Sequence, residues 1–400
     1  MPRADRFESL AGWALLIVVG LNLRPILASV SPLLADIRAA TGMGFQTAAL
    51  LTTLPVICMG LVALLSNRLG GLGERRGIGL GLALIAGACL ARLLCGQAGP
   101  LLATALLGGA GVALIQALLP AVIKRRFEGR VALAMGVYSA SLMGGGGLSA
   151  LSSPLLAQHF QHWQVGLGFW LVPALLALGL WLVRPLPSPA AAPSERSASF
   201  WRNRRAWLLA LYFGLVNCGY MSMVAWLPAY YQQLGWSPTR SGSLLAFMTV
   251  FQVLAALGMP ALAQRGSDRR PLLAASLLAQ AVGYCGLIWA PLELFALWIA
   301  LIGFGLGACF ALSLILTLDH RRDPREAGQL AAFVQGVGFL INAVSPWLSG
   351  WLRELTGSFA SAWLVLLVGV VLMLGVTRLF SPASYRSAVA GSAAPEHRFS

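Results

Sequence analysis

Charged side chains are scarce in this chain of 400 residues. They make up 10% of the sequence, whereas a soluble domain carries about 25%. Hydrophobic residues make up 58% of the chain, and the mean hydropathy is +0.78. The composition excludes an ordinary soluble protein and predicts an all-α protein that crosses a membrane many times.

Acidic residues are the rarer charged type, 13 against 28 basic ones. No Asp or Glu lies in the middle of a hydrophobic run, so the sequence predicts no buried carboxylate relay for protons. Walker, H-E-x-x-H and G-x-S-x-G motifs are absent, which argues against ATP-driven transport and against an enzyme. His159-x-x-His162 supplies only two ligands, and the six cysteines form no C-x-x-C pair, so neither a metal nor a cofactor is expected.

Hydrophobic runs of about 20 residues are long enough to cross a bilayer as helices. The first run has no small-residue cleavage site, so we expect it to be a span and not a signal peptide. Twelve such runs occur, at residues 11–33, 46–66, 78–96, 101–123, 131–156, 165–184, 207–230, 242–263, 272–290, 293–317, 328–352 and 362–380. They predict twelve transmembrane helices.

The basic residues gather on one side of these predicted spans. Alternate loops and both tails hold 23 of them, whereas the opposite loops hold only Arg38, Arg240 and Arg353. By the positive-inside rule the first side is cytoplasmic. We therefore expect a multi-pass protein of the bacterial inner membrane with both termini in the cytoplasm. The net charge of +15 then reflects orientation and contact with anionic lipids in the bilayer, and no nucleic-acid partner is expected.

The two halves of the chain repeat one another. Glu74-Arg75-Arg76 recurs 194 residues later as Asp268-Arg269-Arg270, and Gly109 recurs 196 residues later as Gly305. A near-constant spacing across several helices indicates an internal duplication. Two parallel six-helix repeats are typical of the major facilitator fold. We expect an N-terminal half at 1–184, a cytoplasmic linker at 185–206, a C-terminal half at 207–380, a cytoplasmic tail at 381–400, and a monomer.

Several motifs are more specific than this architecture. They include Gly-Leu-Asn-Leu-Arg-Pro at 20–25, the run Ile-Gln-Ala-Leu-Leu-Pro-Ala-Val-Ile-Lys-Arg-Arg-Phe at 115–127, four glycines at 144–147, Ala-Trp-Leu-Pro-Ala at 225–229 and Gln-Gly-Val-Gly-Phe at 335–339. With these motifs the chain resembles the bacterial cyanate transporter (CynX-type) family, which includes 2-nitroimidazole transporters, from about residue 11 to 380. The resemblance implies transport of a small anion such as cyanate. The alternative is export of 2-nitroimidazole-like or other small aromatic compounds.

Arg24 lies near the middle of the first hydrophobic run, followed by Pro25. A guanidinium at the centre of a membrane helix costs about 2.5–3.5 kcal/mol on insertion scales, so it needs a partner or a wet cavity. Since no fixed carboxylate is available, a mobile anion is the simplest partner, and Arg24 is predicted to bind it at the midplane. A structural arginine bound by carbonyls of neighbouring helices is the alternative. Pro25 is expected to bend the helix here.

Other polar residues inside predicted helices are candidates for the cavity wall. Asn22 and Gln116 could equally hold neighbouring helices together, and Trp226 could belong to the interfacial aromatic belt. Tyr138 and Ser141 lie one turn apart, so we expect them to share a face. The substrate-binding candidates besides Arg24 are Asn22, Gln116, Tyr138, Ser141, Asn217, Trp226, Gln335 and Asn342.

A second set of residues is expected to control access to the cavity. Arg92, near the outer end of the third run, is predicted either to snorkel to the headgroups or to draw anions into an outer vestibule. We expect salt bridges on the cytoplasmic side that break when the halves rock. The candidates for gating or for the vestibule are Arg92, Tyr230, Glu74, Asp268, Arg75 and Arg269. The four glycines at 144–147 are expected to let another helix approach closely. The prediction is a secondary transporter working by alternating access.

Overall fold

A computed structural model describes residues 3–65, 73–127, 130–183, 200–321, 324–383 and 385. Within these ranges it consists of helices and connecting turns, without a strand. Most of the predicted linker, the tail beyond Tyr385 and the loop at 66–72 lie outside the described residues.

The first half of the chain forms six spans. The first span is divided into four pieces, and the last contains α8 and α9. The elements are α1 (Arg3–Leu21), α2 (Pro25–Ala28), the 3₁₀ helix η1 (Ser31–Leu33), α3 (Leu34–Thr41), α4 (Phe45–Leu64), α5 (Glu74–Leu94), α6 (Ala98–Arg126), α7 (Val131–Phe160), α8 (Trp163–Gly168) and α9 (Leu171–Val183).

The second half contributes six unbroken helices, α10 (Arg204–Gln233), α11 (Pro238–Ala263), α12 (Arg270–Trp289), α13 (Phe295–Asp319), α14 (Pro324–Thr356) and α15 (Ala360–Thr377). Eleven helical segments in the described ranges are long and apolar enough to span a membrane, and the Gly- and Ser-rich α7 is the twelfth. The predicted all-α fold of twelve spans is therefore confirmed. The predicted first span, residues 11–33, was too short, because the span continues to Thr41.

The break in the first span follows from its sequence. Pro25 has no N–H to donate and occupies the first position of α2, with Arg24 as the N-cap residue. Before it, Asn22 and Leu23 donate to Val19 and Gly20 at 3.1 Å each, a tightened 3₁₀-like turn. The predicted bend at Pro25 is therefore present, and it removes Arg24 from a regular helical environment.

The glycines of α7 pack against this break. A Cβ on Gly145 would collide with the backbone carbonyl of Leu21, and one on Gly146 would lie 3.3 Å from Cβ of Arg24. Gly147 faces Thr249 and Ala246 of α11 instead. Small residues thus let α7 approach both the broken span and the second half, as the glycine tetrad predicted.

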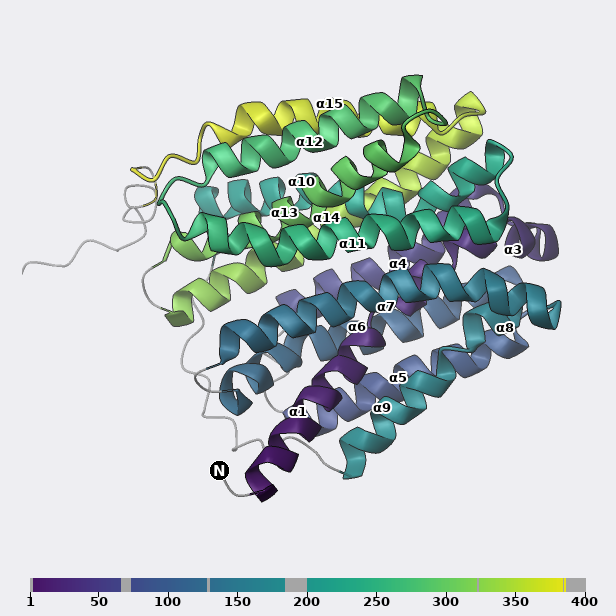
Figure 1. The fold of residues 1–400 in the computed structure, drawn as a ribbon, viewed down its shortest axis with the longest axis horizontal. Coiled ribbons are helices and arrows are strands. Elements are labelled where there is room, and N and C mark those ends of the chain that lie inside the picture. The colour runs from purple at the N-terminus through teal and green to yellow at the C-terminus, as the bar shows by residue number, and fades with distance from the viewer. Residues whose placement is uncertain are drawn as a thin grey trace, which may run out of the picture.

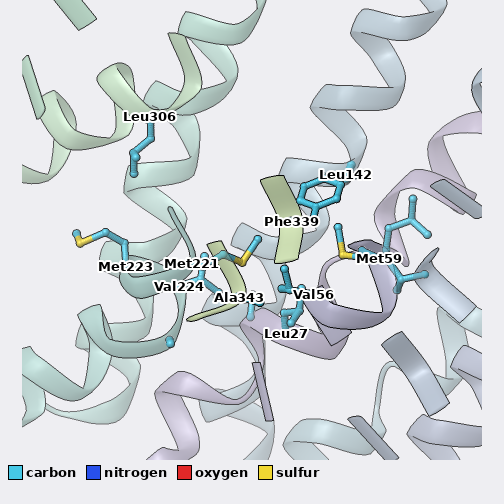
Figure 2. Packing of buried hydrophobic residues seen from close by; sticks show 14 of the residues in the cluster. Leu27, Val56, Met59, Leu142, Met221, Met223, Val224, Leu306, Phe339 and Ala343 are labelled. Carbon is cyan, nitrogen blue, oxygen red and sulfur yellow. The ribbon is translucent and has the colours of Figure 1, made fainter. Parts of the chain in front are cut away.

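Figure 1 shows the helices as two groups, with α1 to α9 in one and α10 to α15 in the other. The groups meet where α4 packs on α14 and α7 packs on α11. We call the end at which α1 begins and α15 ends the terminal end, and the end that carries α3 the far end. Figure 2 shows part of the shared core, with Leu142 of α7, Met59 of α4 and Phe339 of α14 in one cluster.

At the far end the two halves are joined by hydrogen bonds. Ser31 Oγ donates to the carbonyl of Ala225 at 2.7 Å, and Gln232 Nε2 donates to the carbonyl of Pro32 at 2.9 Å. Two further bonds join Thr239 to Gln158 at 3.2 Å and the Gln46 N–H to Glu354 at 3.0 Å. The far end is therefore closed.

Candidate functional site

A cavity of about 210 Å³ lies between the two halves. The break before α2 and helices α6 and α7 supply one wall, and α10, α11, α13 and α14 supply the other. Its polar lining consists of Arg24, Gln116, Tyr138, Ser139, Asn217, Tyr220, Gln252, Gln335 and Asn342. Six of the predicted substrate-binding residues are thus brought together around one space.

Arg24 is buried, with 6% of its surface exposed, and it lines this cavity. Its Nε and Nη1 atoms have no hydrogen-bond partner among the described residues. The guanidinium carbon lies 5.0 Å from the ring centroid of Tyr220, a cation–π contact that does not neutralise the charge. Of the described residues that line the cavity, Arg24 is the single charged one. The described residues therefore leave part of the guanidinium unsatisfied at the edge of the cavity.

Tyr220 on α10 was not predicted as a site residue. It lies 196 residues after Arg24, the same spacing that separates Gly109 from Gly305. The internal repeat therefore carried a signal that could have found it, since residues at repeat spacing occupy corresponding positions in the two halves. Ser139 was missed as well, because it neighbours the better candidate Tyr138.

The amide side chains in the cavity differ in how far the protein satisfies them. Asn217 Nδ2 donates to the carbonyl of Phe213 one turn earlier, at 2.6 Å. Gln252 Oε1 and Asn342 Oδ1 are buried and have no partner among the described residues. A buried amide oxygen without a donor costs free energy, so both of these oxygens call for a donor from water or from a ligand.

A second hollow of about 290 Å³ adjoins the first. Both are lined by Gln116, Pro120, Gln335 and Phe339, and the second extends to Gly328 near the start of α14. Since α14 begins at the terminal end, the cavity continues toward that end, with Gln116 and Gln335 beside the passage. The far end is closed by the bonds described above, whereas the second hollow extends from the cavity toward the terminal end.

Tyr138 lines the cavity, but Ser141 does not. The Ser141 hydroxyl donates to the carbonyl of Val137 at 2.7 Å. Its Cβ packs against Gly20 of α1, where a larger residue would collide with it. Residues of a helix advance by about 100° each. The face of α7 that lines the cavity contains Tyr138, Ser139 and Leu142. Ser141 lies on a different face of the helix, which packs against α1.

Asn22 also lies outside the cavity lining. Its Nδ2 donates to the carbonyl of Val18 at 2.8 Å and to that of Pro173 on α9 at 3.1 Å. Of the two alternatives for Asn22, the structure shows the contact with a neighbouring helix.

Trp226 and Tyr230 lie beyond the cavity toward the far end. Trp226 is 1% exposed, which excludes a place in the lipid-facing aromatic belt. Its Nε1 donates to the carbonyl of Pro346 at 2.8 Å, and its ring lies 5.9 Å from that of Phe45 in the other half. Tyr230 donates to the carbonyl of Leu287 at 2.7 Å, inside the second half. Trp226 thus takes part in closing the far end, whereas Tyr230 packs within one half.

Arg92 is a correction to the sequence prediction. It neither reaches the headgroups nor faces a vestibule, because its side chain is completely buried. Its Nη1 donates to the carbonyl of Ile26 in α2 at 3.0 Å, and its Nε donates to Thr104 at 3.1 Å. The N–H of Val30, which could bond to Ile26 in a continuous α-helix, bonds to Leu27 instead. Arg92 therefore caps a carbonyl that the break leaves free, two residues after Arg24.

The charged residues predicted to join the halves pair within each half in the described parts of the chain. Glu74 of α5 pairs with Arg125 of α6. Arg269 pairs with Asp319 at 2.8 Å, and Asp268 pairs with the neighbouring Arg270 at 2.7 Å, which holds the pKa of the Asp268 carboxyl below its usual value.

The side chain of Arg75 is exposed, and its backbone carbonyl accepts from Trp181 Nε1 at 2.9 Å. The ion pairs described for these residues therefore stay within one half and do not join the two halves.

Comparison with known proteins gives a consistent result. The Major Facilitator Superfamily profile matches residues 16–265 and 232–400. The chain is 46% identical over 373 residues to the "Cyanate transport protein CynX" of Escherichia coli (strain K12), covering 92% of this chain and 97% of that protein. It is 31% identical over 377 residues to the "2-nitroimidazole transporter" of the same organism, covering 92% and 93%.

Among solved structures, the chain is similar to a bacterial homolog of the human lysosomal transporter Spinster, in an inward-facing and occupied conformation. The TM-score is 0.74 at 16% identity, and the match covers 99% of both chains. At this identity the similarity concerns the fold alone.

Proposed function

The chain belongs to the Major Facilitator Superfamily, and on that premise we propose that it carries a small monovalent anion, cyanate first, across the bacterial inner membrane by alternating access. The chain is a multi-pass membrane transporter of this superfamily, and its relative of 46% identity is named for cyanate. The proposal concerns the substrate, the site and the orientation.

The observation that carries the proposal is the state of Arg24. Arg24 lines the cavity, and two donor atoms of its buried guanidinium have no partner among the described residues, which is costly unless something binds there. An anion would neutralise the charge and accept from the planar fork through charge-assisted hydrogen bonds. Gln116, Tyr138 and Gln335 complete the wall around it. Arg24 is thus the substrate-binding group, and the amides are its supporting contacts.

The orientation follows from charge. The terminal end carries most of the basic loops, so it is cytoplasmic and both termini lie inside the cell. The structure then corresponds to an inward-facing state, with the outer end closed by the bonds from Ser31, Gln232 and Thr239. Outward opening requires these bonds to break while the halves rock about Arg24. The halves are residues 1–184 and 207–380, and the protein works as a monomer.

The test replaces Arg24 and measures uptake of labelled cyanate by purified protein in proteoliposomes. Each charge-assisted hydrogen bond contributes about 1.5–3 kcal/mol, so loss of two predicts at least about a 100-fold decrease in uptake for Arg24→Ala. Arg24→Lys restores little, because an ammonium has no planar fork. Arg240→Ala, which removes an exposed arginine stacked on Trp236, serves as the matched control. Wild-type uptake by a folded Arg24→Ala protein would overturn the proposal.

The same vesicles test whether the protein is a transporter without catalysis. Label recovered from the lumen is expected to be unchanged cyanate. Chemical conversion of the label that depends on the protein would contradict this expectation.

Export of 2-nitroimidazole-like compounds is the second candidate. It is favoured by the relative of that name and by the aromatic rings of Tyr138, Tyr220, Phe310 and Phe339 in the cavity. A neutral compound does not need a neutralising cation. Transport of 2-nitroimidazole that survives Arg24→Ala, together with no uptake of cyanate by the wild type, would favour this candidate.

A further inference from the structure

The cavity offers more room and more aromatic surface than a triatomic anion can use. We infer that planar aromatic monoanions form a second substrate class of this site, with the carboxylate on Arg24 and the ring between the two halves. This inference rests on the proposed function of Arg24 as the anion ligand.

The cavity is larger than cyanate requires. A water molecule takes up about 30 Å³ of the liquid, so a cavity of about 210 Å³ has room for several. Cyanate has three heavy atoms and would leave most of that space to water. A six-membered ring with a carboxylate would fill it and displace water from apolar walls.

The walls of the cavity are aromatic and apolar. Tyr138 belongs to the first half and Tyr220 to the second, and Phe310 and Phe339 add two rings from α13 and α14. Thioethers fill the remaining apolar surface, and they adapt to ligands of different outline and make favourable contacts with ring edges. They belong to Met135, Met143 and Met221. Aromatic contacts of this kind contribute about 0.5–1.5 kcal/mol beyond burial of area, and a saturated ring of the same size does not gain them.

Charge also restricts the ligand. Arg24 is the single charged residue among the described residues that line the cavity, so the site can neutralise one negative charge. A dianion would bring a second charge into the apolar part with no partner. The class is therefore limited to monoanions.

The wall across from the first half also carries amide side chains. Asn342 Oδ1 and Gln252 Oε1, from α14 and α11, are buried acceptors without a donor among the described residues. Both side chains also line the cavity, so a rotation of either amide would present its oxygen to a ring substituent that donates a hydrogen bond. A donor on the ring is thus expected to improve binding.

The experiment measures displacement of labelled cyanate from the purified protein in detergent, which avoids diffusion of weak acids across vesicles. Benzoate and cyclohexanecarboxylate form a matched pair with the same charge and a similar size, and only benzoate is planar. Benzoate is expected to displace cyanate at a concentration about 2- to 12-fold lower, the range given by the aromatic contribution. 4-Aminobenzoate is expected to bind about 2- to 10-fold more tightly than benzoate, and terephthalate is expected not to compete.

Two variants test whether the rings are responsible. Phe310→Leu and Phe339→Leu are expected to bring the ratio between benzoate and cyclohexanecarboxylate toward one. Because that ratio is measured within a single variant, it does not depend on how the substitution affects folding or cyanate binding. Labelled benzoate is also expected to enter proteoliposomes in an Arg24-dependent way.

The possible results separate the two proposals. Equal displacement by benzoate and cyclohexanecarboxylate, or no displacement by benzoate, overturns the inference about aromatic monoanions. The proposed function is supported separately, by cyanate binding that depends on Arg24. Arg24-dependent benzoate uptake by a protein that does not take up cyanate supports the aromatic class and overturns cyanate as the first substrate.

Discussion

Replacement of Arg92 by Met tests whether the break in the first span must be held in place for the proposed anion site to bind cyanate. The substitution keeps an unbranched side chain of similar length and removes the two donors that bind Ile26 and Thr104. Ile26 lies two residues after Arg24, so loss of its cap frees the backbone that positions the guanidinium proposed to bind the substrate.

The size of the effect follows from the groups left behind. The carbonyl of Ile26 would be buried without a donor, which costs about 1–3 kcal/mol. The hydroxyl of Thr104 keeps its bond to the carbonyl of Leu101 at 2.7 Å and costs little. Removal of a buried cation also removes its desolvation cost, which offsets part of the lost stability. The backbone at Ile26 still loses its cap, so the main effect is expected on the position of Arg24. At 1.4 kcal/mol for each factor of ten, cyanate affinity is expected to fall about 5- to 100-fold.

The assay compares cyanate affinity and melting temperature in two variants. Thr104→Val leaves the bond from Arg92 to Ile26 intact but removes the acceptor of Arg92 Nε. It is therefore expected to lower the melting temperature with little loss of cyanate affinity. Arg92→Met is expected to show the opposite pattern. In an Arg24→Ala background Arg92→Met should have no further effect on affinity, because the group it positions is already absent. Wild-type affinity in Arg92→Met would refute the reasoning.

Two further predictions concern packing and pH. Gly145→Ala places a methyl group against the carbonyl of Leu21, so it is expected to destabilise the protein by about 1–3 kcal/mol in thermal unfolding, whereas Gly179→Ala, with open space around it, should not. Burial lowers the pKa of His320 to about 4, and its neutral Nε2 accepts from Arg205 at 3.1 Å. Since the unfolded chain takes up this proton near pH 6.5, stability is expected to fall by about 3 kcal/mol as the pH drops from 6.5 to 4. His320→Gln should flatten that dependence, and an unchanged pH profile would contradict the assignment.

Much of the fold was predictable because the bilayer imposes strong local rules. A run of about 20 apolar residues must form a helix there, since the backbone has no water to bond with. Pro25 predicted the bend in the first span for an equally local reason. The predicted first span was too short, because after the bend the chain continues as α2, η1 and α3 to Thr41.

The site was predictable only in part. Arg24 could be singled out, because a lone charge in an apolar run requires an explanation wherever the helix points. Ser141 and Trp226 were predicted to line the cavity, but the rotation of α7 directs Ser141 toward α1, and Trp226 lies farther along α10, where it bonds to Pro346.

The sequence by itself determined the number of spans, the repeat of the two halves and the presence of Arg24 inside the first hydrophobic run, with no acidic residue in the middle of any run to neutralise it. These properties depend on composition and spacing, which are local. Tertiary structure decided that the ring of Tyr220 lies beside Arg24, that Gln252 lines the same cavity, and that Arg92 is buried against the break. Those outcomes depend on how closely α7 approaches Leu21 and on how each helix is rotated. They are set by packing between segments that are far apart in the chain.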